Sequence, residues 1–115
     1  MINGAHIIQY SANAEADRAF LRDVLQFSSV DAGHGWLIFK LPPAEAAFHP
    51  TDGEKGAELY LMCDDLQAEM KSLEAKGVRF STITEARWGI VTHIELPSGG
   101  TIGLYQPKHP TALSL

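Results

Sequence analysis

An imidazole and a carboxylate occupy equivalent positions in two similar stretches of this 115-residue chain. His6 begins the β-rich run "HIIQYS", and Glu58 begins the run "ELYLMC". A buried carboxylate is costly without a partner, so Glu58 would need either a divalent metal ion or His6 beside it. A neutral imidazole with a carboxylate suits Zn, Fe, Mn, Ni or Co. A hydrogen-bonded interior histidine would account for His6 equally well.

Further groups that could serve a small-molecule site fall on the same strand faces. Successive side chains of a strand point to opposite faces, so alternate residues share one face. We therefore expect a concave face that carries Glu58, His93 and Tyr105 as candidate catalytic groups and Tyr10, Tyr60, Met62 and Gly103 as candidate substrate-binding groups. The opposite face, under a helix, should receive Leu59, Leu61, Cys63, Ile102 and Leu104. An exposed strand face would explain His93 as well.

Other reactive or aromatic residues have simpler explanations. Cys63 reads as a small buried hydrophobe rather than a nucleophile. We interpret Trp36 and Trp88 as aromatic side chains that pack within the protein or border a site, rather than as platforms on which a ligand stacks. His34 and His109 lie in segments flanked by glycine or proline, and we assign them no role.

Matching segments in the same order predict two copies of one unit of about fifty residues. "GAHIIQYSANAEADRAF" begins at Gly4, and "GAELYLMCDDLQAEMKSL" begins at Gly56. In the same order, "FSSV" is echoed by "FSTI", "KLP" by "ELP" and "FHP" by "YQP", and the spacing grows from 52 to 57 residues. We therefore expect a single domain, residues 1–115, built of repeats over about 4–50 and 56–107.

Each copy reads as a strand, a helix and three further strands. The first helix should start after the N-cap Asn13 and run to about Gln26, and the second should start at a capping box of Asp64 and Gln67. First strands should begin near His6 and Glu58, and later strands should cover 27–31, 35–41, 45–49, 79–82, 90–96 and 101–106. The order βαβββ, twice, predicts an α+β protein with curved sheets, helices on one side and a cavity on the other. A ferredoxin-like α+β dimer is the runner-up fold.

Composition narrows the classes of partner. The net charge is −5 and no run of lysine or arginine occurs, so nucleic acid and anionic membranes are not expected partners. No apolar stretch has the length of a membrane span, and no signal-peptide pattern is seen. The single cysteine excludes an intrachain disulfide, which fits a cytoplasmic protein.

Three segments together resemble the vicinal oxygen chelate superfamily, which includes glyoxalase I, bleomycin-resistance proteins and extradiol dioxygenases. They are "HIIQYSANAEADRAFLRDVLQF", "ELYLMCDDLQAEMKSLEAKGVRF" and "RWGIVTHIELPSGGTIGLYQP". The resemblance implies paired βαβββ modules that form an open barrel around a divalent metal, with ligands from the first and last strands of each module. It also implies a homodimer, whose modules pair either within one chain or between two chains.

Only two of the four ligand positions that the resemblance implies carry a side chain able to bind a metal. It places His6 and Glu58 on first-strand ligand positions, while Gly103 stands where the last strand would carry a ligand glutamate, and Ala46 is its counterpart in the first copy. His49 or His93 could supply a third nitrogen ligand. The repeat alignment puts His49 off the cavity face, and a bulge would be needed to turn it inward.

Two functions follow from this mixed result. One is a metal-assisted lyase, isomerase or dioxygenase, in which a tyrosine or His93 orients the substrate or moves a proton. The other is a metal-free protein that sequesters a small molecule, as bleomycin-resistance proteins do. In that case Gly103 would leave space for the ligand beside the backbone. An assembly or regulatory domain is a third class, but no feature of the sequence favours it.

Overall fold

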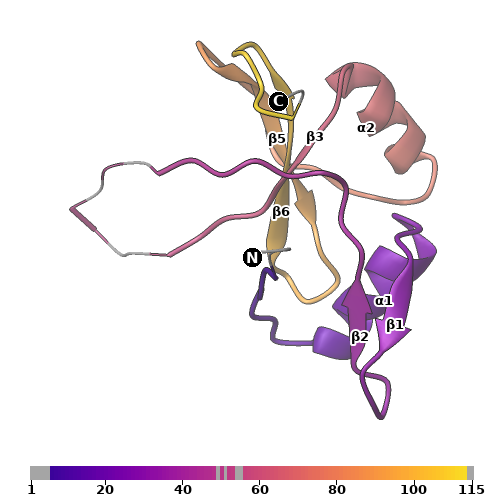
Figure 1. Ribbon diagram of the computed structural model, residues 1–115. Helices are drawn as coiled ribbons and strands as arrows, with labels where there is room; N and C mark the ends of the chain where they lie inside the picture. The colour runs from indigo at the N-terminus through magenta and orange to yellow at the C-terminus, as the bar shows by residue number, and fades with distance from the viewer. Residues whose placement is uncertain (1–5, 49, 51, 54–55, 114–115) are drawn as a thin grey trace.

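The computed structural model describes residues 6–48, 50, 52–53 and 56–113. In chain order, its elements are α1 (Ala14–Asp23), β1 (Ser29–Asp31), β2 (Leu37–Phe39), β3 (Tyr60–Met62), α2 (Leu66–Glu74), β4 (Thr84–Ala86), β5 (Gly89–Glu95) and β6 (Thr101–Pro107). β1 and β2 form an antiparallel ribbon (Figure 1). The other strands form a sheet in the order β3-β6-β5-β4. β3 runs parallel to β6, whereas the other neighbours are antiparallel. The predicted α+β class with a mixed sheet is confirmed.

Local signals set the ends of the helices. Asn13 caps α1 as predicted, since its side chain accepts a hydrogen bond from the backbone N–H of Ala16. The helix stops before Gln26, which has a left-handed φ of 60°. In α2 the cap is Asp65, whose carboxylate accepts from the N–H of Ala68, so the predicted box starting at Asp64 was one residue early. The reason is that Asp65, not its neighbour, directly precedes the first helical residue.

One core lies between the helices and the four-stranded sheet, and both helices cover the same side of that sheet (Figure 1). Leu66 of α2 and Ile94 of β5 are 1% and 0% exposed. The buried cluster consists of Phe20, Leu66, Leu73, Val78, Ile94, Leu96, Ile102 and Leu104. Leu59, Leu61 and Cys63 pack against it from β3 and its flanks, so the predicted helix-facing set is confirmed. Neither described helix has the length and apolar content that a membrane crossing requires.

A carboxylate on α1 ties this helix to the turn between β5 and β6. Asp17 accepts hydrogen bonds from the backbone N–H of Ser98 at 3.1 Å and from its hydroxyl at 2.7 Å. The Ser11 hydroxyl donates to the same carboxylate at 2.6 Å. The two hydrogen bonds from Ser98 join positions 81 residues apart, so the first half of the chain is anchored to the second.

Two predicted strands of the first repeat are not formed. Residues 6–11 and 45–48 have no strand pairing, and in the second repeat β3 begins at Tyr60 rather than at Glu58. A strand is stable only beside a neighbour that takes its hydrogen bonds, and these segments have none among the described residues. Ile8 and Tyr10 are accordingly 69% and 92% exposed. The two-repeat organisation stays a prediction.

The second half of the chain follows the expected order more closely. β3 is followed by α2 and then by three strands, of which β5 and β6 lie within a residue of the predicted ranges. The first of the three, β4, lies at Thr84–Ala86 instead of 79–82, where only Phe80 bridges to Ile94. Gly77, with a φ of 85°, follows the end of α2 as the Lys76-Gly77 stop signal predicted.

Candidate small-molecule site

The sheet face opposite the helices carries a continuous set of rings, which we call the aromatic row: Tyr60, His93, Tyr105, Trp88 and His109. The Tyr60 ring lies 5.7 Å from that of His93 and 5.8 Å from that of Tyr105, between centroids. Tyr105 in turn lies 5.6 Å from Trp88 and 6.1 Å from His109. All four contacts are tilted or edge-to-face, and edge-to-face packing is one of the geometries that aromatic pairs favour.

Strand register explains why the rings meet. Gly103 is the pairing partner of Tyr60 on β3 and also of His93 on β5. A Cβ atom at position 103 would collide with the Tyr60 ring, so the missing side chain is the space in which that ring lies. The gap that the sequence suggested for a ligand at Gly103 is therefore filled from within the chain.

Two carboxylates approach the aromatic row. The Tyr60 hydroxyl donates to Oε2 of Glu58 at 2.9 Å. Burial raises the pKa of Tyr60, and the Glu58 carboxylate raises it further. Burial also raises the pKa of Tyr105, with a smaller contribution from the charge of Glu45. Both phenols therefore stay protonated near neutral pH and can donate hydrogen bonds.

His109 meets the other end of the row. Its Nδ1 lies 2.7 Å from the Pro110 carbonyl, and its Nε2 lies 3.3 Å from the Tyr105 hydroxyl. A carbonyl only accepts, so in the neutral imidazole Nδ1 carries the proton and Nε2 accepts from Tyr105. The segment after β6 thus holds the Tyr105 hydroxyl in place.

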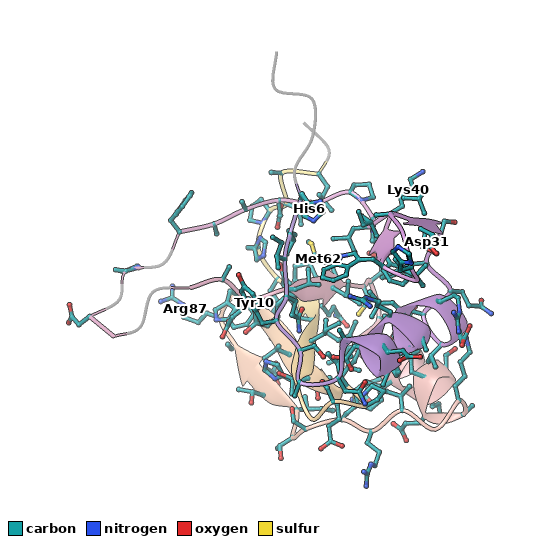
Figure 2. All side chains as sticks on the ribbon, turned by 90° about the horizontal axis from the view of Figure 1, so that it is seen from below. His6, Tyr10, Asp31, Lys40, Met62 and Arg87 are labelled. Atoms are coloured by element: carbon teal, nitrogen blue, oxygen red, sulfur yellow. The ribbon has the colours of Figure 1, made fainter. Side chains whose placement is uncertain are left out.

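The structure brings together five of the predicted site residues: Glu58, Tyr60, His93, Gly103 and Tyr105. Met62 follows on β3 and lines a separate cavity of about 340 Å³ with Cys63, Asp64, Glu69, Pro107, Thr111 and Leu113. His6 and Tyr10 are exposed on the N-terminal segment (Figure 2). His49 lies outside the described residues.

Among the residues that the structure describes, the donor side chains do not fit a metal ion. Over the described ranges, no three side chains of histidine, cysteine, aspartate or glutamate gather closely enough to hold one. Of the predicted ligands, Glu58 is engaged by the Tyr60 hydroxyl and His6 is solvent-exposed. Protein metal sites of the expected kind use three or four protein ligands.

Trp88 and His109 belong to the row but were not assigned to it from the sequence. The position of His109 could have been predicted from strand alternation. Gly103 and Tyr105 share one face, and every second residue after them leads through Pro107 to His109. For Trp88 it was not, because its contact with Tyr105 depends on how the turn between β4 and β5 folds back.

Cys63 should react slowly with alkylating reagents. Its pKa is raised to about 11, mainly by burial and then by the charges of Glu69 and Asp64. A raised thiol pKa lowers the thiolate fraction at pH 8, so carboxamidomethylation by iodoacetamide should be about a hundredfold slower than for an ordinary cysteine. Mass spectrometry over time checks this, with the urea-unfolded protein as the reference. Equal rates in the folded and unfolded protein would contradict the expectation.

Solved structures share this arrangement of helices and strands. TnmS3, an antibiotic binding protein from Streptomyces sp. CB03234, superposes with a TM-score of 0.61 and 24% identity, over 94% of this chain and 100% of that one. Lactoylglutathione lyase from Agrobacterium tumefaciens superposes with a TM-score of 0.60 and 18% identity, and the match covers 85% of this chain and 88% of that one. A member of the glyoxalase/bleomycin resistance protein/dioxygenase superfamily from Sphaerobacter thermophilus DSM 20745 superposes with a TM-score of 0.60 and 20% identity. That match covers 91% of this chain and 98% of the other. The fold is that of the glyoxalase/bleomycin resistance protein/dioxygenase superfamily.

Proteins with this superfamily fold include both an enzyme and a binding protein, so the likeness fixes the architecture and leaves the activity to the site. By sequence, no family model matches the chain, and no curated protein matches it either. The aromatic row is the feature on which a function can be argued.

Proposed function

We propose that this protein binds a small aromatic molecule on the aromatic row and holds it without chemical change. The observation that carries the proposal is the connected set of five rings on one sheet face, in which Tyr60 and Tyr105 contact each other and link the remaining three. Trp88 is 43% exposed, so a planar ligand has a surface on which to stack. The likeness to TnmS3, an antibiotic binding protein, supports the same class of function.

The chemistry of the row favours a neutral or cationic ligand over an anionic one. Glu58 accepts a hydrogen bond from the hydroxyl of Tyr60, and the negative charge of Glu45 contributes to the raised pKa of Tyr105. The faces of tyrosine and tryptophan rings are electron-rich and attract cations. A small-molecule site of this kind combines an apolar surface with a few polar groups that fix orientation, which here are the two phenol hydroxyls.

Binding of 9-aminoacridine, a planar aromatic cation, tests the proposal by calorimetry. Trp88→Leu should weaken its binding about tenfold, because an aromatic contact contributes on the order of 1 kcal/mol beyond simple burial. Trp36→Leu is the matched control, since Trp36 stacks with Arg18, outside the row, and should leave the affinity unchanged. Equal losses in the two variants, or no binding by the wild type, would contradict the proposal.

The metal-assisted enzyme is the alternative that the sequence raised, and the same calorimeter separates the two. Zn²⁺, Mn²⁺, Ni²⁺ and Co²⁺ are each titrated into the wild type, His6→Ala and Cys63→Ser. Binding that is kept in Cys63→Ser and abolished in His6→Ala would favour the metal-assisted function over sequestration. Absence of that pattern favours the binding protein.

A further inference from the structure

A second pocket lies on the helix side of the sheet, where the end of α1 and the residues after α2 meet the turn that follows β5. Its volume is about 340 Å³, near the lower limit for sites that hold small molecules. Its apolar walls are formed by Phe20, Val24, Val78, Leu96 and Pro97. Phe20, Val78 and Leu96 also belong to the buried core, so the sheet separates this pocket from the aromatic row on its other face.

The charged residues that line this pocket are mostly basic. Lys76 and Arg79 supply two positive charges, and Glu95 supplies one negative charge. Two positive charges and one negative charge give the lining a net charge of +1, whereas the whole chain carries −5. An apolar pocket with a positive lining is complementary to a ligand that has an apolar body and one negative group.

Both cations keep hydrogen-bond donors that no described residue uses. The Lys76 ammonium donates to the carbonyl of Val24 at 3.3 Å, which holds it at the pocket and leaves its other two N–H groups available. Nε of Arg79 lies 3.5 Å from Oε2 of Glu95, and these side chains are 86% and 52% exposed, so the ion pair is weak. The terminal nitrogens of Arg79 have no hydrogen-bond partner within the part of the chain that the structure describes.

We propose that this pocket binds a small aliphatic carboxylate, of the chemical class of the medium-chain fatty acids. The apolar walls contact the hydrocarbon, and the ammonium of Lys76 and the guanidinium of Arg79 donate charge-assisted hydrogen bonds to the carboxylate. Phe20 is the single ring among the lining residues, so the pocket offers a planar ligand no pair of rings between which to stack, and this favours an aliphatic body. The site takes an anion on the helix side of the sheet, whereas the aromatic row favours a cation on the opposite face.

Calorimetric titration with octanoate tests the proposal. Lys76→Met should weaken octanoate binding about tenfold, because it removes the ammonium and keeps an apolar side chain of similar length. Lys71→Met is the matched control, since Lys71 lies on α2 outside the pocket, and it should leave the affinity unchanged. Lys76→Arg keeps the positive charge and should retain most of the affinity. Circular dichroism verifies that all three variants are folded.

An uncharged ligand of the same chain length isolates the contribution of the carboxylate. 1-Octanol should bind the wild type more weakly than octanoate does, and Lys76→Met should bind the two ligands about equally. No binding of octanoate by the wild type, or equal losses in Lys76→Met and Lys71→Met, would overturn the proposal.

Nuclear magnetic resonance locates the bound octanoate. Its addition should shift the backbone amide signals of Gly77, Val78 and Leu96, which line the pocket, and leave those of Tyr60 and Tyr105 unchanged. Shifts confined to the two tyrosines would place octanoate on the aromatic row and overturn the assignment of the pocket. Trp88→Leu, the variant that tests the aromatic row, should bind octanoate as the wild type does, so the failure of either proposal is recognised separately from the failure of the other.

Discussion

Replacing Gly103 by valine should destabilise the protein by about 3 kcal/mol, at the upper end of what overpacking a core costs. The Tyr60 ring occupies the space that the new side chain would need. Position 103 is buried on the central strand β6, with β3 on one side and β5 on the other, so the backbone cannot move away cheaply. The valine would push the Tyr60 ring off the sheet and separate it from His93 and Tyr105.

Urea unfolding measures the loss of stability. Tyr60→Ala in the Gly103→Val background should recover part of it, which a double-mutant cycle detects as a coupling of 1 kcal/mol or more, about the size seen for residues in contact. Gly100→Ala is the control. A Cβ there meets only the Ser98 hydroxyl at 3.4 Å and a Leu96 methyl at 3.8 Å. Additive effects of the first two substitutions would show that the ring does not depend on the glycine.

Asp17→Ala should cost about 2–3 kcal/mol, although the aspartate lies on a surface helix. Its carboxylate takes three hydrogen bonds, two from Ser98 and one from Ser11. Hydrogen bonds to a charged group are individually worth about 1.5–3 kcal/mol, and partial solvent access at this site reduces their sum. The substitution also removes the main polar tie between α1 and the turn that joins β5 to β6.

The same urea titration compares Asp17→Ala with Glu15→Ala, which removes an acidic residue from the same helical turn. Glu15 is exposed, and its favourable interaction with the helix dipole is worth well under 1 kcal/mol in most helices, so that variant should change little. Asp17→Asn keeps the shape and removes the charge, and it should fall between the two. Equal destabilisation by the two alanine variants would mean that Asp17 stabilises the protein through its charge near the start of the helix and not through its hydrogen bonds to Ser98.

Much of the second half of the molecule was predictable because its signals are local. Alternation separated Leu59 and Leu61 from Tyr60, and it placed Tyr105 and His93 on one face. Period-two alternation is a direct consequence of strand geometry, so it holds wherever a strand forms. Asn13 was found as a cap because its side chain reaches a backbone N–H only three residues away.

What the sequence could not supply were relations between distant segments. Ile8 and Tyr10 have the residue types of a strand, yet strand formation depends on a neighbour that the described part of the chain does not provide. Trp88 reaches Tyr105 through the register of antiparallel strands, which alternation alone does not specify. The role of Gly103 was open for the same reason: only the parallel pairing with β3 shows that Tyr60 lies over it.

The pairing of Tyr60 with Gly103 also bears on how this chain could change during evolution. The resemblance drawn from the sequence puts a metal-binding glutamate at position 103 in related proteins. Here that glutamate would have no room while the Tyr60 ring is in place, and a smaller residue at position 60 alone would leave a hole over the glycine. A glutamate at position 103 therefore requires a smaller residue at position 60 as well, so a metal ligand at this position depends on two substitutions that are coupled through one steric contact.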